Sequence, residues 1–477
     1  MRIRGTPIVE QDQALKVMVE ARYQEMKEKA KASIEKAAAV SLTSDMWISI
    51  NTEAYLAVTC HFVDESSTLN TVVLGVQYFP NAHTAENIAQ VKGSLMTEWA
   101  ITDKVTCLVT DGAANMGACA RELRLKHAIC IAHTLNLVVK KALDQTPEVS
   151  DIRAKSRKIV GYFRSSATAK ERLSVVQEQL RKPQFKLIQE VETRWNSTYN
   201  MLQRLFEQME PVGAALASLT TDIPPVSSEE FGIISECLLV LAPFNDATTE
   251  LSQEKRRSGS KVIPLLTMLD HCLNEQMEKS PSIGSSLAQK LRMLLREKLD
   301  KIQTMSIMFL ATLLDPRFRK LGFLRPARAS EAEERLKAEC ASVMRASTTS
   351  SSSAPPPQPS TSQTVEAVSH GNNLWHRLDE SVRPTQTHNV TADANIEVQR
   401  YMMEPNIGRL EDPLKYWERQ KYVYPHLYKL ALTYLCTPAS SVPCERVFSK
   451  AGEILSKKRN RLRPATVEKL LFLNKNQ

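Results

Sequence analysis

The chain has no pair of cysteines in the Cys-x-x-Cys spacing that zinc knuckles and thiol pairs use, and its nine cysteines are an odd number. This pattern excludes a disulfide framework and favours a reducing compartment. Neither cysteine nor histidine occurs before Cys60 and His61, so the first residues hold no Cys/His zinc finger. We therefore predict no structural zinc.

Long apolar runs are lacking as well. No stretch approaches the ~18 consecutive apolar residues of a membrane span. The opening residues MRIRGTPIVEQDQ also lack the apolar core of a signal peptide. We expect a soluble, intracellular protein that does not use a membrane as a partner.

The chain does contain enough apolar material for a normal core, because 43% of its 477 residues are hydrophobic. This length is typical of a few domains, at about 100–200 residues each. Lys and Arg total 62 against 53 Asp and Glu, which gives a formal charge of +9. The excess favours a polyanionic partner, although it is mild for so long a chain.

The first 150 residues alternate between strand and helix signals. Residues 11–39 are rich in Ala, Lys, Glu and Met and predict a helix. The runs SLTSDMWIS, YLAVTCHFVD and TVVLGVQYF then predict three strands in meander order, followed by a helix at 84–99. VTCLVTDG and HAICIAH predict two more strands, each with a helix after it. This order predicts an α/β fold in which helices flank a mixed sheet.

From residue 150 to 345 the pattern is almost wholly helical, and we interpret it as an all-α insertion. It follows an N-terminal helical segment (1–39) and the first part of the sheet domain (40–149). The Ser/Pro-rich stretch 346–392 cannot form a core and predicts a disordered linker. Residues 393–477 are helical again and rich in Tyr and Trp. The helices predicted within the insertion are 150–164, 167–181, 198–219, 228–251, 261–278 and 283–303.

Two aspartates lie where carboxylates on neighbouring strands can meet. Asp45 is in the first predicted strand, and Asp111 ends the fourth, just before Gly112, which permits a tight turn. Phosphodiester cleavage by two metal ions about 4 Å apart needs several carboxylates at one point. A single aspartate here is also typical of a turn or a helix cap, so the pair is stronger evidence than either residue alone.

Six sequence blocks occur in the order SDMWIS (44–49), VTDGAANM (109–116), CIAHTLNLVV (130–139), TRWNSTYNML (193–202), LDPRFRKL (314–321) and SSVPCERVFSKAG (440–452). In this order they resemble the blocks of hAT transposases, and most closely those of the branch of BED zinc finger proteins. The resemblance covers nearly all of residues 40–477. It implies an RNase H-like fold interrupted by a large all-α insertion domain, with residues 393–477 as a C-terminal dimerisation region that completes the core.

The resemblance also assigns a third acid. The Glu of the family's ERVFS block falls on Glu445, which implies a site of Asp45, Asp111 and Glu445 around Mg²⁺ or Mn²⁺. Magnesium prefers oxygen ligands and usually takes one or two carboxylates plus phosphate and water. Glu445 closely follows Pro443, where the first turn of a helix favours negative charge, and both roles can hold together.

Two of the blocks imply contacts with DNA. His133 forms a Cys-x-x-His pair with Cys130 that resembles a family motif beside the active site; the alternative is a core histidine, and the pair lacks the further ligands of a zinc site. Trp195 resembles the family tryptophan that stacks on a flipped base, and the alternative is ordinary helix packing. Its neighbours Arg194 and Asn196 are predicted to contact phosphate.

The C-terminal region carries two predicted surfaces, each with a plainer alternative. The self-association surface has core packing as its alternative, and comprises Tyr416, Trp417, Tyr424, Val447 and Phe448. The DNA-binding surface is a basic run that also fits a nuclear import signal or a solvated helix end, and comprises Lys457, Lys458, Arg459 and Arg461.

These features predict a nuclear, DNA-binding protein that forms a homodimer or a higher homo-oligomer, with no small-molecule substrate. One hypothesis is a transposase that retains a DDE-type site for DNA cleavage and strand transfer. The alternative is a domesticated chromatin or transcription regulator without enzymatic activity, or with the SUMO ligase activity linked to one related branch. This branch usually begins with a BED finger, which this sequence lacks through truncation, a lost exon or decay. The lack argues against sequence-specific DNA binding and does not affect the general DNA-handling face.

Overall fold

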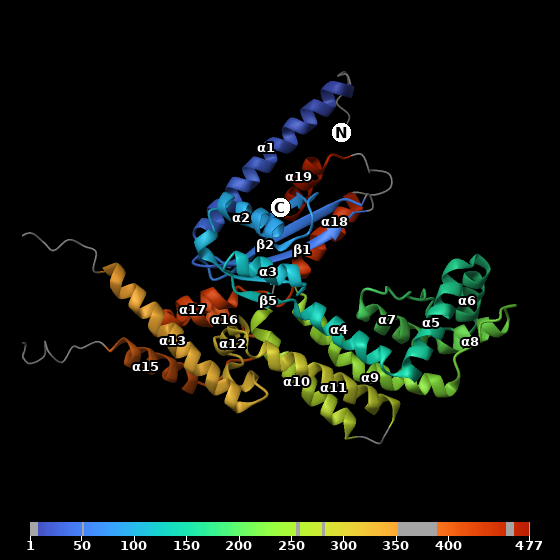
Figure 1. The fold of residues 1–477 in the computed structure, drawn as a ribbon. Helices are drawn as coiled ribbons and strands as arrows, with labels where there is room; N and C mark the ends of the chain where they lie inside the picture. Colours follow the sequence, from blue (N-terminus) through green and yellow to red (C-terminus); the bar gives the residue numbers. More distant parts are fainter. Residues whose placement is uncertain are drawn as a thin grey trace, which may run out of the picture.

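A five-stranded mixed sheet in the order β3-β2-β1-β4-β5 forms the upper part of the molecule in Figure 1. The computed structural model describes residues 8–49, 52–253, 258–278, 282–351, 389–454 and 462–476. The first three strands form an antiparallel meander, and the last two run parallel to β1. The predicted mixed sheet with flanking helices is confirmed. The strands are β1 (Val40–Ile48), β2 (Ala54–Val63), β3 (Leu69–Tyr78), β4 (Val105–Thr110) and β5 (His127–Ile129).

Helices cover both faces of this sheet. On one face lie α1 (Ile8–Glu35), α2 (Ala85–Glu98) and α3 (Ala114–Glu122), whose apolar side chains share one core cluster with the strands. On the other face, α18 and α19 pack over β1 to β3, and α4 packs over β4. These three helices are α4 (Ile131–Asp144), α18 (Val442–Ile454) and α19 (Pro464–Lys475). The sheet is therefore completed by helices from the far end of the chain.

The alternation of side chains along β1 determines what faces α18. The Oγ1 of Thr43 lies 3.3 Å from the Sγ of Cys444, and the ring of Trp47 stacks on that of Phe448 with centroids 5.9 Å apart. Asp45 lies between these two residues on the same face of the strand. It is thereby directed towards the start of α18.

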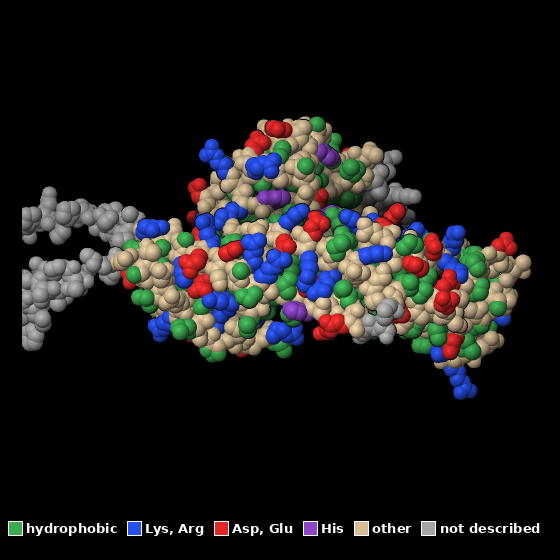
Figure 2. Space-filling model, turned by 60° about the horizontal axis from the view of Figure 1, so that its bottom comes forward, with side chains coloured by type: hydrophobic (Ala, Val, Ile, Leu, Met, Phe, Trp, Pro, Cys, Tyr) green, Lys and Arg blue, Asp and Glu red, His purple; other side chains and the backbone are tan. Residues whose placement is uncertain are grey.

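A long helical body lies beneath the sheet (Figure 1). The face turned forward in Figure 2 carries Lys and Arg side chains along this body, with acidic side chains between them. The helices of its first part are α5 (Pro147–Ser165), α6 (Ala167–Gln179), α7 (Trp195–Glu207), α8 (Met209–Ala217), α9 (Ser228–Leu251), α10 (Val262–Met277), α11 (Ile283–Ile302) and α12 (Ser306–Leu313).

The single helix predicted at 198–219 is two helices, α7 and α8, which meet at Gln208. The backbone of Gln208 leaves the helical region at φ −110° and ψ 21°. Pro211 has no N–H with which to continue the ladder across this point. The buried side chain of Gln208 accepts a hydrogen bond from Gln177 at 2.8 Å, which fixes the break against α6.

Helix α9 is long and apolar enough to cross a membrane by length and composition alone. Its buried side chains include Cys237, Leu241 and Phe244, which belong to the largest apolar cluster of the molecule. The helix packs against α4, α5, α7, α10 and α11. These contacts are those of a core helix.

The C-terminal part of the helical body consists of α13, α15, α16 and α17, which pack against α12 and one another. Both ends of the linker predicted at 346–392 are helical instead, because α13 continues through Ser351 and α15 begins at Val390. The rest of that stretch, 352–388, lies outside the described residues. The helices are α13 (Pro326–Ser351), α15 (Val390–Met403), α16 (Pro413–Gln420) and α17 (Pro425–Leu435).

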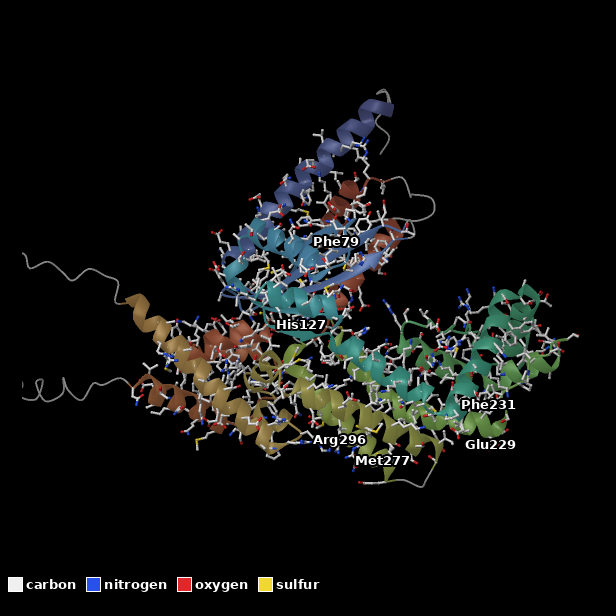
Figure 3. The ribbon with its side chains drawn as sticks, viewed as in Figure 1. Phe79, His127, Glu229, Phe231, Met277 and Arg296 are labelled. Atoms are coloured by element: carbon white, nitrogen blue, oxygen red, sulfur yellow. The ribbon has the colours of Figure 1, made fainter. Side chains whose placement is uncertain are left out.

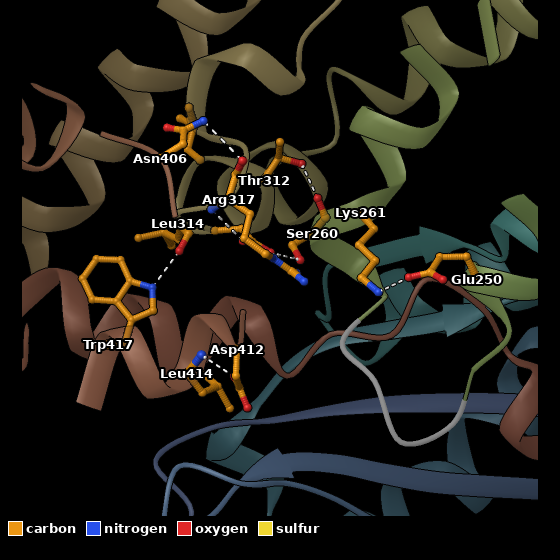
Figure 4. Close-up of polar contacts among 12 residues, drawn as sticks. Glu250, Ser260, Lys261, Thr312, Leu314, Arg317, Asn406, Asp412, Leu414 and Trp417 are labelled. Atoms are coloured by element: carbon orange, nitrogen blue, oxygen red, sulfur yellow. Dashed lines mark hydrogen bonds and ion pairs between the residues drawn. The ribbon is translucent and has the colours of Figure 1, made fainter. Parts of the chain in front are cut away.

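A buried carboxylate links the segment just before α10 to the segment just after α12 (Figure 4). Asp315, which is fully buried, accepts a hydrogen bond from the hydroxyl of Ser260 at 2.6 Å. The guanidinium of Arg317 binds both oxygens of the same carboxylate, at 2.8 and 2.5 Å. The LDPRFRKL block is thus a structural joint, in which a buried charge is paired and fully hydrogen-bonded.

Candidate functional site

Asp45 lies in the middle of the sheet, on β1, opposite Ala57 of β2. Its Oδ1 accepts a hydrogen bond from the backbone N–H of Met46 at 2.8 Å. Burial, together with the negative charges of Glu445 and Asp111, raises the pKa of the Asp45 carboxyl to about 7. Asp45 is therefore close enough to Asp111 and to Glu445 for their negative charges to disfavour its own.

Asp111 directly follows β4, which runs parallel to β1. The turn after it requires glycine, because Gly112 has φ +85° and a Cβ there would lie 3.3 Å from Ile129. The Asp111 Oδ1 accepts the N–H of Ala113 at 3.1 Å. His127 of β5, at the junction of the sheet and the helical body in Figure 3, lies 2.9 Å from the Thr110 hydroxyl.

Cys444, the residue before Glu445, holds the start of α18 against the sheet. Cys444 is fully buried between α18 and the sheet, where its Sγ contacts Thr43 at 3.3 Å and the backbone oxygen of Ala57 at 3.7 Å. Glu445 occupies the first turn of α18, which also favours an acid through the helix dipole. The structure thus brings Asp45, Asp111 and Glu445 to one region, from three separate elements.

A buried lysine lies close enough to Asp45 and Asp111 to interact with their charges. Lys92 of α2 is 1% exposed, and its ammonium donates to the Sδ of Met116 at 3.4 Å. Burial lowers the pKa of Lys92, and the charge of Lys92 in turn opposes the rise in the pKa of Asp45. The sequence contains a signal for this residue, because Lys92 occupies a position of apolar spacing between Ile88 and Leu95.

The described residues contain no group of three or more His, Cys, Asp and Glu side chains that could hold a metal ion by themselves. Magnesium seldom uses such an all-protein cage and takes one or two carboxylates with phosphate and water. The three carboxylates offer oxygen ligands, which are the type that a hard divalent cation prefers. The donor set is compatible with Mg²⁺ or Mn²⁺ when nucleic acid supplies further oxygens.

A pocket of about 540 Å³ opens between the sheet domain and the helical body, and Glu445 lies in its wall. His133 is exposed on the first turn of α4 at this pocket, so it is not a core histidine. Polar groups dominate the wall. Its lining residues are Ala132, His133, Asn136, Thr193, Arg194, Trp195, Asn196, Thr248, Ser252, Val442, Glu445, Arg446 and Ser449.

Arg194 pairs with the third acid across the pocket, with its Nη2 3.2 Å from the Oε2 of Glu445. The loop that carries Arg194 is anchored by Glu190, whose side chain is 1% exposed. The guanidinium of Arg153 contacts one oxygen of Glu190 at 2.6 Å, and that of Arg157 contacts the other at 2.8 Å. Predicted phosphate-binding Asn196 instead donates its amide to Asn245 at 2.9 Å.

Trp195 is buried, with 1% of its surface exposed, and its ring packs edge-on against Phe244. Its backbone N–H donates to Asn136 at 2.9 Å. The indole Nε1 and the hydroxyl of Thr248 are both buried without a hydrogen-bond partner in the described structure. Stacking on a base would require this ring to be uncovered, and that role stays a prediction.

The Cys-x-x-His pair has a capping role that the sequence did not reveal. Cys130 is the N-cap of α4, and its Sγ accepts the backbone N–H of His133 at 3.5 Å. The same sulfur accepts the N–H of Ser441 at 3.4 Å, just before α18. The backbone N–H of Ile131 also donates to Ala439 at 2.9 Å. Cys130 therefore joins the starts of two helices that border the pocket.

The predicted self-association residues are wrong, because all of them are buried within the chain. The aromatic members surround Tyr401 in the helical body, and the aliphatic and phenyl members of α18 pack on the sheet. Apolar periodicity alone does not distinguish an internal partner from an external one. The residues whose predicted role is corrected in this way are Tyr416, Trp417, Tyr424, Val447 and Phe448.

Other apolar side chains of the same region are exposed instead. Met403, Leu410 and Tyr422 are each at least 86% exposed, and Val423 is 42% exposed. They belong to the stretch from the end of α15 to the start of α17. The predicted DNA-binding residues of the basic run, Lys457, Lys458, Arg459 and Arg461, lie outside the described residues.

Three family models match this chain. The ZBED1 RNase-like domain matches residues 43–137, which contain the sheet with Asp45 and Asp111. The ZBED1 RNase-like helical domain matches 128–236, and the hAT family C-terminal dimerisation region matches 397–477, which contains Glu445. The matched segments meet in space around the pocket.

Relatives match most of the chain. Zinc finger BED domain-containing protein 4 from Homo sapiens is 27% identical over 92% of this chain. Putative transcriptional regulator tpeD from Talaromyces stipitatus is 23% identical over 94%, and putative AC transposase from Zea mays is 25% identical over 90%. The chain spans 37%, 55% and 56% of the length of these relatives, respectively.

Proposed function

Since the chain belongs to the hAT family of transposases and related BED zinc finger proteins, we propose that it cleaves and joins DNA at Asp45, Asp111 and Glu445. The observation that carries the proposal is the convergence of these acids from three separate elements, namely β1, the end of β4 and the start of α18. Burial, together with the negative charges of Glu445 and Asp111, raises the pKa of Asp45 to about 7. A carboxyl whose pKa is raised by burial and by neighbouring acids is typical of a functional site, and of these three acids Asp45 is the one in that position.

The three carboxylates would hold Mg²⁺ or Mn²⁺ together with phosphate oxygens of DNA. Bound metal activates the attacking oxygen and stabilises the leaving oxygen of the phosphodiester. The chain's own contribution is to fix the acids on a rigid sheet and helix. Gly112 and Cys444 support this role, because each fixes the backbone next to one acid.

The pocket beside Glu445 is proposed to receive the DNA. His133 and Arg194 are exposed at its rim, and Asn196 lies in its wall, so each can contact phosphate once DNA enters. The unpartnered indole N–H of Trp195 and the hydroxyl of Thr248 add two polar groups that a nucleotide can satisfy. The basic run 457–461, which lies outside the described residues, is proposed to bind phosphates as well.

The protein is also proposed to be a nuclear homodimer or higher homo-oligomer. The match to the hAT C-terminal dimerisation region supports self-association. The surface that we assign to it contains the exposed apolar side chains Met403, Leu410 and Tyr422, because the apolar residues chosen from the sequence are buried.

A nicking assay tests the proposed reaction. The full chain with Mn²⁺ is expected to nick supercoiled plasmid DNA, and Asp111→Asn and Glu445→Gln are expected to lower the rate by about 100-fold or more. Asp103→Asn, an exposed acid on the turn before β4, is the matched control and keeps the wild-type rate. Nicking that persists in Asp111→Asn would contradict the proposal.

The second candidate is a DNA-binding regulator without cleavage activity. The relative named putative transcriptional regulator tpeD favours it, as does the ion pair that engages Glu445. Retarded migration of duplex DNA in gels, unchanged by Asp111→Asn and without any Mn²⁺-dependent nicking, would favour this function over the first.

A further inference from the structure

Of the three proposed metal-binding acids, only Glu445 has an ion-pair partner within the described residues. Its partner, Arg194, comes from the loop before α7, 251 residues earlier in the chain. We propose that Arg194 is a positioning residue, which holds Glu445 until a DNA phosphate takes its guanidinium. On this view, which rests on the proposed function, entry of DNA completes the metal site.

The pair is suited to exchange because it is exposed. The side chain of Arg194 is 68% exposed and that of Glu445 is 37% exposed, and a single Nη2–Oε2 contact of 3.2 Å joins them. An exposed ion pair of this kind shifts an equilibrium by about fivefold or less. A phosphate offers Arg two parallel charge-assisted hydrogen bonds, so it competes well for the same guanidinium.

The loop remains in place when the pair opens. Glu190 stays bound to Arg153 and Arg157, and the backbone N–H of Trp195 stays bound to Asn136. None of these contacts involves Glu445. The guanidinium of Arg194 is therefore presented at the rim of the pocket in both states, and the exchange needs side-chain rotation alone.

The exchange has a direct consequence for metal binding. A carboxylate oxygen that accepts a bond from Arg194 has fewer lone pairs for a cation, and the nearby positive charge opposes the cation as well. Release of Glu445 thus adds an oxygen donor beside Asp45 and Asp111. Because binding effects are reciprocal, DNA tightens metal binding and metal tightens DNA binding by the same factor.

The test measures Mn²⁺ binding to the full chain by the electron paramagnetic resonance of free Mn²⁺. Each protein is measured alone and with a short blunt duplex, and the duplex alone is subtracted. For the wild type, we expect the duplex to tighten Mn²⁺ binding. For Arg194→Gln without DNA, we expect binding about three- to fivefold tighter than wild type, and a smaller further gain from the duplex.

Two comparisons separate the ion pair from general repulsion. Arg446→Gln removes the same charge from the same pocket wall, but its guanidinium donates to the Ser252 backbone oxygen at 2.8 Å instead. It is expected to tighten Mn²⁺ binding less than Arg194→Gln. In the Glu445→Gln background, Arg194→Gln is expected to have no effect, because the residue acts through Glu445.

The inference is overturned if Arg194→Gln binds Mn²⁺ no more tightly than wild type, or if its effect persists in the Glu445→Gln background. Those results leave the proposed function intact, provided that the wild type binds Mn²⁺ with the duplex and an Asp45→Ala/Asp111→Ala variant does not. If the wild type binds no Mn²⁺ even with the duplex, the proposed function itself falls, and the inference falls with it.

Discussion

The indole N–H of Trp417 donates to the backbone oxygen of Leu314 at 2.7 Å (Figure 4). The two residues are 103 positions apart, and the bond ties α16 to the end of α12. The ring of Trp417 is fully buried and lies 4.9 Å from that of Tyr401. An aromatic stretch that resembles an intermolecular surface is therefore an internal joint between the insertion and the C-terminal region.

Trp417→Phe keeps an aromatic ring at this buried position but removes the donor to the Leu314 carbonyl, and the smaller ring leaves a cavity that adds to the loss of stability. A buried acceptor that loses its partner costs about 1–3 kcal/mol, and we expect at least that decrease in the free energy of unfolding. Urea denaturation followed by circular dichroism measures it. Tyr422→Phe, at an 86% exposed position, is the control and is expected to change nothing.

Asp315→Ala removes the partner of a buried charge. Arg317 is 7% exposed and would lose both of its bonds to the carboxylate. Breaking a buried pair in this way destabilises by about 3–5 kcal/mol. Asp300→Ala breaks a 3.7 Å pair with Arg325 in which both side chains are about half exposed. An equal loss of stability in the two variants, measured by chemical denaturation, would contradict this role of Asp315.

The imidazole of His61 makes stability depend on pH. Burial lowers the pKa of His61 to about 3, and the ring is bonded to Thr59 at 2.9 Å and Thr71 at 3.0 Å. In the unfolded chain a histidine titrates near pH ~6.5, so between these values the unfolded state binds more protons. Stability is therefore present above pH ~6.5 and is lost as the pH falls towards the folded pKa.

His61→Gln is expected to remove this component. Between pH 7 and 5, wild type should lose about 2 kcal/mol more than the variant, at about 1.4 kcal/mol per pH unit below the unfolded pKa. Urea denaturation at both pH values gives the difference. Identical pH dependence in the two proteins would show that His61 is not the group responsible.

Phe448→Ala and Tyr422→Ser distinguish core packing from self-association. Phe448 stacks on Trp47 under α18, so its truncation should cost about 3–5 kcal/mol of stability without changing the oligomeric state of the folded protein. Tyr422→Ser should leave stability unchanged and weaken self-association. Sedimentation velocity, combined with denaturation, separates the two effects, and the reverse assignment would restore the sequence-based surface.

Gly112→Ala tests the turn that presents Asp111. A left-handed backbone costs a non-glycine residue about 1–2 kcal/mol, and the contact with Ile129 at 3.3 Å adds to this cost. We expect lower stability and reduced nicking. Gly213→Ala in α8 is the matched control, because nothing lies within 4 Å of its Cβ. That change should raise helix stability by about 0.5–1 kcal/mol, as measured by thermal unfolding.

The sheet could be predicted from the sequence because its strands are β-branched and are separated by clear polar turns. Asp45 and Asp111 followed from their places on β1 and β4. Glu445 could not be found from spacing, since the helical insertion separates it from Asp111, and only the block resemblance assigned it. The DDE role of these acids stays a prediction.

Predictions from the sequence were wrong where the local pattern does not specify what a side chain packs against. Apolar side chains such as those of Phe448 and Trp417 suit a core and an interface equally well. Only the packing of the folded chain shows which of the two they belong to. The capping role of Cys130 was not predicted, because its sulfur accepts one backbone N–H from its own helix and another from Ser441, far away in the sequence. The break at Gln208 has a local signal in Pro211, which the helical periodicity of 198–219 obscured, and a tertiary hydrogen bond with Gln177 fixes it in place.

The cover of the sheet by α18 and α19 has a consequence for synthesis on the ribosome. The strands of the sheet are translated long before α18 and α19, which bury one of its apolar faces. That face of the nascent sheet stays uncovered until residues 442–475 have left the exit tunnel. Termination before residue 442 thus removes the helices that bury this face of the sheet, together with Glu445. Such a product exposes an apolar face of its sheet and lacks one of the three acids.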